Sequence, residues 1–203
     1  GDLVKVTSPH GAIELPAYPT ELVHAGVVAV AMGQGHKYAG AFDGGWSAYR
    51  EHVFARQKEL GIVPADAELS RHDPDVPEWD SLSADARRLA SRMMEVFAGF
   101  LSHTDHHLGR LLDFLRGLGK LDNTIVMVIS DNGASSEGGP GGTTNEAQFF
   151  NNAQEPLEDS LALIDEIGGP NHFNHYPWGW TWAGNTPFRR WKRETYRGGT
   201  ADP

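Results

Sequence analysis

The stretch Thr124–Gly139, TIVMVISDNGASSEGG, joins an uninterrupted apolar run to a polar segment rich in small residues. Ile125 to Ile129 show no alternation of apolar and polar residues, which predicts a strand buried on both faces, as in a parallel sheet covered by helices. In such sheets ligands bind beyond the carboxyl ends of the strands, where Asp131 and Asn132 lie. The stretch therefore predicts an α/β fold whose strand end carries the chemistry.

Asp131 and Asn132 offer adjacent oxygen ligands, which suit Ca²⁺ or Mg²⁺ better than a soft metal. The same Asp-Asn-Gly sequence is also an ordinary turn, because Asn-Gly is the preferred pair of a type I′ turn. Position along the chain favours neither interpretation over the other.

A long helix is expected immediately before this strand. Apolar residues recur at three- and four-residue spacing from Ala84 to Leu118, which predicts one long or kinked helix with a single buried stripe. Ser83 is expected to cap its N-terminus, and Gly117 and Gly119 to end it. A helix followed by a buried strand is half of a βαβ unit. The stripe contains Leu89, Met93, Val96, Phe97, Phe100, Leu101, Leu108, Leu111, Leu112, Leu115 and Leu118.

Two further helical features concern packing and a possible metal pair. A second helix is predicted over Trp46–Leu60, with Tyr49, Val53 and Leu60 at roughly helical intervals.

Inside the long helix, His103 and His107 have the i, i+4 spacing of metal-binding pairs, but no third ligand is nearby in the sequence. A metal role for that pair is therefore the less favoured interpretation.

Short strands are expected at the N-terminus. DLVKVTS, AIELPAY and GVVAVAM are short β-like runs bounded by Gly or Pro, which indicates part of a small barrel or sandwich. The segment from Val63 to Ser83, with three prolines and many acids, is expected to be a surface connection.

Composition limits the classes of partner. Lys and Arg total 17 against 27 for Asp and Glu, and the resulting charge of −10 argues against nucleic acid and favours cations. The absence of Cys excludes disulfides, thiolate metal sites and a cysteine nucleophile. No apolar run approaches the ~20 residues of a membrane-spanning helix, so we expect a soluble chain without a membrane partner. Because the chain starts at Gly1 without an initiator Met, we interpret it as a fragment whose leader, compartment and oligomeric state stay open.

The segments after the strand combine loops with aromatic and basic residues. Residues 134–156 are polar and rich in glycine, which is typical of a functional or mobile loop. Trp178, Trp180 and Trp182 follow, together with His172, His175, Arg189, Arg190, Lys192 and Arg193. Aromatic walls with cations suit an anionic ester carrying an apolar group. A loop whose tryptophans pin it to the core is the favoured alternative.

From about Ala41 to Pro203 the chain resembles the sulfatase family, specifically the long bacterial arylsulfatases. GAFDGGWSAYREHVFARQKELGIVP, DHHLGRLLDFLRGLGKLDNTIVMVISDNGAS and NTPFRRWKRETYRGGTADP occur in the order of that family. The resemblance implies a partial alkaline-phosphatase-like α/β domain with a mixed, mostly parallel sheet and flanking helices. It also implies that Asp131 and Asn132 bind a metal, usually Ca²⁺, with Mg²⁺ as an alternative, and that Lys192 contacts the sulfate of a small-molecule sulfate ester.

The same resemblance implies hydrolysis of sulfate esters to an alcohol or phenol plus sulfate by a formylglycine nucleophile. That residue is made from the Cys or Ser of a Cys/Ser-x-Pro-x-Arg motif, which this chain does not contain. The early acidic pair that completes the metal site and the upstream Lys and His of the family are missing too. No catalytic nucleophile is therefore expected here, and this polypeptide by itself should be inactive.

Residues 1–38 resemble a different family, the molybdopterin-dinucleotide-binding domain of molybdopterin oxidoreductases, through GDLVKV, GAIELP and GQGH. Gly33 and Gly35 would let the backbone approach a pyrophosphate. An alternative places His10, six residues before Pro16, at an active-site histidine of sulfatases. We interpret the chain as a hybrid joined near Lys37–Gly40, by genuine fusion or by mis-joining of two sequences.

Three functional hypotheses follow. The first is an arylsulfatase fragment carrying part of the metal and sulfate site. The second is a C-terminal piece of a molybdopterin oxidoreductase, which rests on residues 1–38 alone. The third is a nonenzymatic remnant that holds an anion with its Trp and Arg residues.

Overall fold

The computed structural model describes residues 3–8, 11–16 and 38–200. The chain divides into two compact units, Gly1–Ala31 and Met32–Pro203. In the first, β1 (Leu3–Ser8) and β2 (Gly11–Pro16) form an antiparallel hairpin in which Leu3 lies opposite Pro16. These strands coincide with the first two expected runs. The third run, and with it His10, Gly33 and Gly35, lies outside the described residues.

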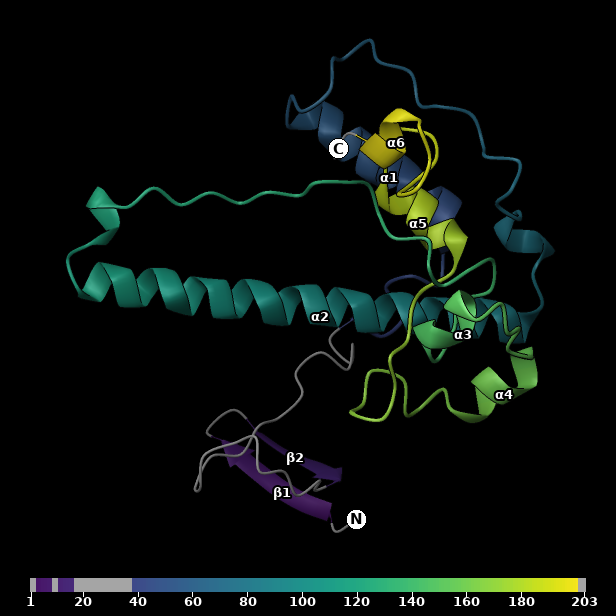
Figure 1. Ribbon diagram of the computed structural model, residues 1–203, viewed down its shortest axis with the longest axis horizontal. Coiled ribbons are helices and arrows are strands. Elements are labelled where there is room, and N and C mark those ends of the chain that lie inside the picture. The colour runs from purple at the N-terminus through teal and green to yellow at the C-terminus, as the bar shows by residue number, and fades with distance from the viewer. Residues whose placement is uncertain (1–2, 9–10, 17–37, 201–203) are drawn as a thin grey trace. The chain divides into compact units, whose positions relative to one another are not determined.

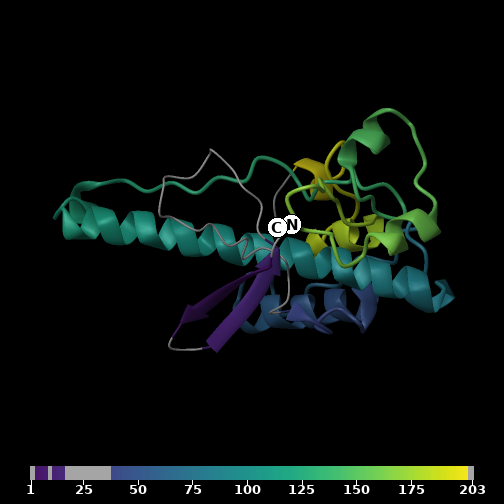
Figure 2. The ribbon, with the colours of Figure 1, turned by 90° about the horizontal axis from the view of Figure 1, so that it is seen from below.

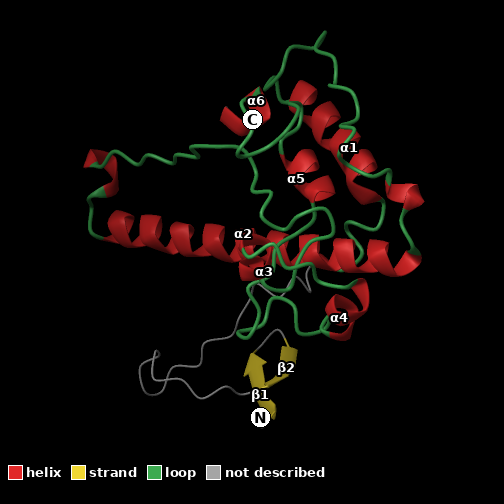
Figure 3. Ribbon diagram, turned by 45° about the vertical axis from the view of Figure 1, so that its right-hand side comes forward, coloured by secondary structure: helices red, strands yellow, loops and turns green. Residues whose placement is uncertain are grey.

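The described part of the second unit is built from helices and loops (Figures 1 and 3). Its elements are α1 (Gly45–Glu59), the 3-10 turn η2 (Trp79–Ser81), α2 (Ala84–Gly117), the 3-10 turn η3 (Leu121–Asn123), α3 (Glu146–Phe150), α4 (Leu157–Ala162), α5 (Trp178–Gly184) and α6 (Arg197–Thr200). Within residues 38–200 the only β pairing is two isolated bridges, Thr143 with His175 and Asn145 with Phe173. The expected mixed, mostly parallel sheet is therefore not formed by the described residues.

The predicted strand at Ile125–Ile129 is wrong for this structure. The segment is extended, but it belongs to no strand, and its five side chains are 51–88% exposed. The segment runs back beside α2, antiparallel to the helix (Figures 1 and 2). An extended apolar run becomes a buried strand only when neighbouring strands satisfy its backbone and helices cover its faces. None of the described segments supplies such a neighbour.

The helix expected over 84–118 is confirmed as the 34-residue α2, and the Ser83 hydroxyl caps it by accepting the Ala86 N–H at 3.1 Å. The prediction of a single buried stripe along this helix is correct only for its first half. Leu89, Met93 and Val96 are buried, whereas the apolar residues from Phe100 onward are largely exposed. Periodicity identifies the apolar face of a helix, but burial of that face depends on what other segments cover it.

An aromatic cluster joins α1, α5 and the first half of α2. Trp180 of α5 is 1% exposed, its ring lies 5.4–5.9 Å from those of Phe42, Trp46, Tyr49 and Trp79, and its Nε1 donates to the Ala90 carbonyl at 2.9 Å. Trp178, Trp180 and Trp182 pack against the core, as the favoured alternative expected, but they lie on a helix and not on a loop.

The helix expected over 46–60 is confirmed as α1, but the residues that suggested it do not form its buried face. Tyr49 and Val53 are half-buried and Leu60 is 57% exposed. Trp46, Arg50 and Phe54 face the interior instead. Arg50 is buried because its guanidinium donates to the Ser70, Pro187 and Phe188 carbonyls, so a charged residue lies on the inner face.

Candidate metal and sulfate site

The backbone after Asp131 and Asn132 lies against the C-terminal segment. The Gly133 N–H donates to the Gly199 carbonyl at 3.4 Å. A Cβ on Gly133 would lie 1.6 Å from the Gly198 carbonyl oxygen, so only glycine allows this approach. Neither Asn132 nor Gly133 has a positive φ. The type I′ turn needs positive φ at both central residues, so that alternative is wrong, and Gly133 is required by close contact instead.

Asn185 connects the two segments. Its side chain is 1% exposed, its Oδ1 accepts the Ala134 N–H at 2.9 Å, and its Nδ2 donates to the Arg190 carbonyl at 3.0 Å. The Lys192 N–H donates to the Ala134 carbonyl at 3.1 Å. Residues 131–134 and 185–192, far apart in sequence, are thereby held side by side. Asn185 is the first residue of the NTPFRRWK motif, but the sequence analysis did not identify it as a site residue. The neighbouring residues in the sequence do not indicate that its amide bridges two distant backbone segments.

Asp131 and Asn132 face each other at the surface. Asp131 is exposed, Asn132 is half-buried, and the Asn132 amide donates to the Asp131 carboxylate. Calcium takes 6–8 oxygen ligands in proteins, and the described residues contain no cluster of three or more His, Asp or Glu arranged for a metal. The two side chains suit a hard cation, but they supply only part of its ligands. The other ligands would have to come from outside the described residues.

Lys192 forms an ion pair with a buried carboxylate. Its Nζ lies 3.4 Å from Oε1 of Glu137, whose side chain is 8% exposed, while that of Lys192 is 43% exposed. The Ser135 hydroxyl donates to the other carboxylate oxygen of Glu137. Burial raises the pKa of Tyr176, and the Glu137 charge raises it further. The ion pair with Glu137 holds the Lys192 side chain against the segment that follows Asp131 and Asn132.

Other members of the basic cluster are engaged within the fold. Arg190 forms ion pairs with Asp73, at 3.4 Å, and with Asp75, and the Asp75 hydrogen bond is the main cause that raises the pKa of Arg190. Arg189 lies over the Tyr196 ring at 5.5 Å, and Arg193 over the Phe149 ring at 5.7 Å. The charge of Arg190 is thus already compensated, which disfavours a cluster of free cations collecting an anion.

The glycine-rich segment contains two buried threonines that are hydrogen-bonded to Glu155. Thr143 and Thr144 are buried, and Glu155 accepts both of their hydroxyls and the Thr144 N–H at 2.5–2.9 Å. Burial opposes the ionisation of Glu155, but these hydrogen bonds and one from Ser160 outweigh it and lower its pKa. Thr143 and Thr144 are thus fixed to Glu155, while the expectation of a functional or mobile loop stays a prediction for the segment as a whole.

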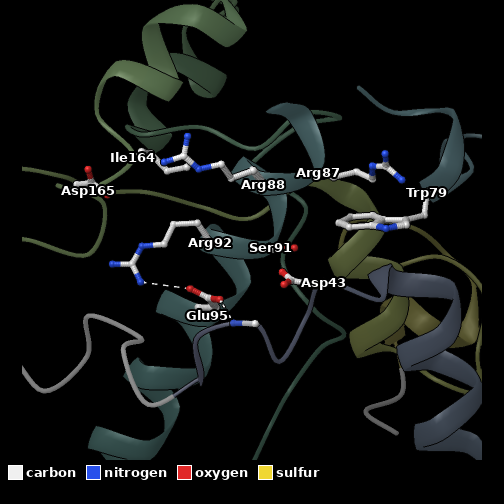
Figure 4. Close-up of a pocket in the computed structure, with 10 residues that line it drawn as sticks. Asp43, Trp79, Arg87, Arg88, Ser91, Arg92, Glu95, Ile164 and Asp165 are labelled. Carbon is white, nitrogen blue, oxygen red and sulfur yellow. Dashed lines mark hydrogen bonds and ion pairs between the residues drawn. The ribbon is translucent and has the colours of Figure 1, made fainter. Parts of the chain in front are cut away.

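A separate pocket of about 470 Å³ lies beside the first half of α2 (Figure 4). Arg92 lies 3.5 Å from Glu95, and Glu95 also accepts the Gly40 N–H at 2.8 Å. None of the residues expected to bind metal or sulfate lines this pocket. The residues predicted to bind metal and sulfate therefore lie outside this concavity.

Comparison with known proteins gives the family. The Sulfatase family model matches residues 31–203. The chain belongs to the sulfatase family. An uncharacterized sulfatase of Schizosaccharomyces pombe (strain 972) is 30% identical over 169 residues, covering 83% of this chain and 29% of the relative. An arylsulfatase of Klebsiella aerogenes is 26% identical over 162 residues, covering 78% of this chain and 32% of the relative.

This sulfatase sequence therefore spans less than a third of the length of the relatives it matches. The family match begins at residue 31, ahead of the expected join at Lys37–Gly40. The sulfatase portion thus extends into the segment assigned by resemblance to a molybdopterin-oxidoreductase-like fragment, and that resemblance stays a prediction. Among the described residues, no helix combines the length and apolarity that crossing a bilayer requires.

Proposed function

We propose that this chain is the part of an arylsulfatase that supplies Asp131 and Asn132 to a Ca²⁺ site and Lys192 to the sulfate group of a small-molecule ester. The observation that carries the proposal is the link between the two segments. The Lys192 N–H donates to the Ala134 carbonyl, and Asn185 ties the same loop to Arg190. The backbone segments that carry the two motifs are thereby linked, which supports a shared site for their side chains.

Each residue has a distinct role in the proposed site. Asp131 and Asn132 would hold the cation through their side-chain oxygens. A bound cation supplies positive charge that polarises the sulfuryl oxygens. Lys192, kept in place by Glu137, would donate to a sulfuryl oxygen and stabilise negative charge there. Because the chain lacks the Cys/Ser-x-Pro-x-Arg motif, the proposal assigns it binding of metal and sulfate and no nucleophilic step.

Calorimetric titration of the full chain with CaCl₂ tests the metal part of this proposal. The variant Asp131→Ala with Asn132→Ala should lose the binding heat of the wild type. The chain also provides a matched control, because Asp122 and Asn123 form a second Asp-Asn pair on the exposed turn η3. Replacing both by Ala should leave binding unchanged. Equal Ca²⁺ affinity in all three proteins, or no binding by the folded wild type, would contradict the metal assignment.

The sulfate part is tested separately with inorganic sulfate and phenyl sulfate as ligands. Lys192→Met should weaken binding of both, whereas Lys120→Met, which removes an exposed lysine near η3, should not. If the two lysine variants behave alike, Lys192 does not contact the anion. Far-UV circular dichroism of every variant shows whether the fold is retained.

A further inference from the structure

The exposed second half of α2 carries a histidine pair that takes no part in the proposed sulfatase site. His103 and His107 lie one helical turn apart, on the same face of the helix. Their Nε2 atoms are 3.0 Å apart, and their ring centroids are separated by 4.4 Å. His107 is exposed and His103 is half-exposed, so solvent reaches the space around both rings. Two imidazole nitrogens thus converge on one point at the surface.

This separation matches that of two neighbouring ligands on one metal ion. Imidazole nitrogens bind metals at about 2.0–2.1 Å, so two of them at a right angle lie about 2.9 Å apart. A right angle between ligands is typical of the tetragonal and square-planar sites of copper(II) and nickel(II), for which imidazole is a preferred ligand. A tetrahedral ion would place the same nitrogens about 3.3 Å apart. In the structure a hydrogen bond holds the two nitrogens 3.0 Å apart, so both can face one ion with little movement of the rings.

We propose that His103 and His107 chelate a divalent transition-metal ion of the copper(II) and nickel(II) class, with water completing its coordination. The described residues hold no cluster of three or more His, Asp or Glu suited to a metal, so this part of the chain offers two ligands to the ion. Copper(II) should bind more tightly than nickel(II), as the general order of affinities requires. The hard Ca²⁺ ion proposed for Asp131 and Asn132 prefers oxygen and should not compete for this pair.

Arg110 opposes metal binding in the structure. Its Nη1 lies 3.0 Å from Nδ1 of His107, and because a guanidinium only donates, this Nδ1 must accept. The proton of neutral His107 is then on Nε2, from which it is donated to Nε2 of His103. Coordination through Nε2 of His107 requires that proton to move to Nδ1, so that no net proton is released, and Arg110 must turn away. Arg110 is exposed and free to do so.

Calorimetric titration of the tag-free full chain with CuCl₂, and then with NiCl₂, tests the proposal. His103→Gln and His107→Gln should each weaken the site at least about tenfold, because one ligand of a chelating pair is lost. Arg110→Met should tighten it by up to about tenfold, because a competing hydrogen bond is removed. His106→Gln is the matched control, since His106 is the adjacent histidine and its ring lies 5.3 Å from that of His107. It should bind as the wild type does.

Electron paramagnetic resonance of the copper complex gives an independent readout. The wild type should show coordination by two imidazole nitrogens, and either Gln variant by one at most. Copper affinity that is unchanged in His103→Gln and His107→Gln, or absent in the wild type, would overturn the chelate. Weaker binding by Arg110→Met would overturn the role given to Arg110. All four positions have exposed or half-exposed side chains, and circular dichroism checks that α2 is intact.

Discussion

Replacing Asn185 by Ala should destabilise the protein and separate the two segments of the proposed site. The substitution leaves the Ala134 N–H and the Arg190 carbonyl without their side-chain partner, in surroundings where Asn185 itself is 1% exposed. A buried polar group that loses its partner costs about 1–3 kcal/mol. Because both backbone groups are partly accessible to water, we expect about 2–4 kcal/mol in total, a large share of the ~5–15 kcal/mol that stabilises a typical domain.

Urea unfolding followed by far-UV circular dichroism measures this loss, and Asn151→Ala provides the matched control. Asn151 also donates from its amide to a backbone carbonyl, that of Ala147, at 2.7 Å, but it is exposed. Water replaces that hydrogen bond, so the control should lose less than about 1 kcal/mol. If Asn185→Ala is no less stable than Asn151→Ala, the bridge does not hold the segments together. Calcium titration of the Asn185→Ala variant should also show weaker binding than the wild type.

Three further predictions concern the helix α2, the aromatic cluster and acid stability. Gly109→Ala should raise the free energy of unfolding by about 0.5–1 kcal/mol, because a Cβ there meets no atom within 4 Å and glycine is a poor helix former; a lower melting temperature would contradict this. Trp180→Ala should cost about 3–5 kcal/mol, since it empties the centre of the aromatic cluster. Trp180→Phe, which loses mainly the hydrogen bond to the Ala90 carbonyl, should cost less in the same urea assay. Glu155 has a lower pKa in the folded state than its ordinary value of 4.5, so its ionised form stabilises the protein above that pH, and this contribution is lost as the pH falls through the folded value. A Glu155→Gln variant should therefore show a shallower loss of stability in acid, and identical pH profiles would refute the role of the carboxylate.

Local patterns predicted the two longest helices, α1 and α2, but none of the four short ones among the described residues. The bounds of α1 and α2 follow from periodicity, capping residues and terminal glycines, all of which act within one or two turns. The burial of their faces could not be predicted in the same way. Leu89 and Leu111 belong to the same apolar stripe, but only Leu89 is covered by other segments. Burial depends on contacts between segments that are distant in the sequence, and the sequence of one helix does not indicate those contacts.

The sequence proposes residues for the site, but it does not indicate the contacts that hold their segments together. Asp131, Asn132 and Lys192 came from motifs, and the structure brings their segments together. Asn185 and Glu137 were missed because their importance depends on partners 51 and 55 positions away in sequence. The strand at Ile125–Ile129 failed for a related reason, because β structure is a property of pairs of segments.

The exposed run from Ile125 to Ile129 has a practical consequence for anyone handling this chain. Five consecutive apolar, mostly β-branched residues without a charge or proline form a segment that readily pairs with copies of itself. In concentrated solution such segments associate edge to edge into insoluble cross-β assemblies, and an accessible extended backbone is also a preferred site of protease cleavage. Purification at low concentration, with a Lys substituted for Val128 where solubility matters, follows directly from this feature.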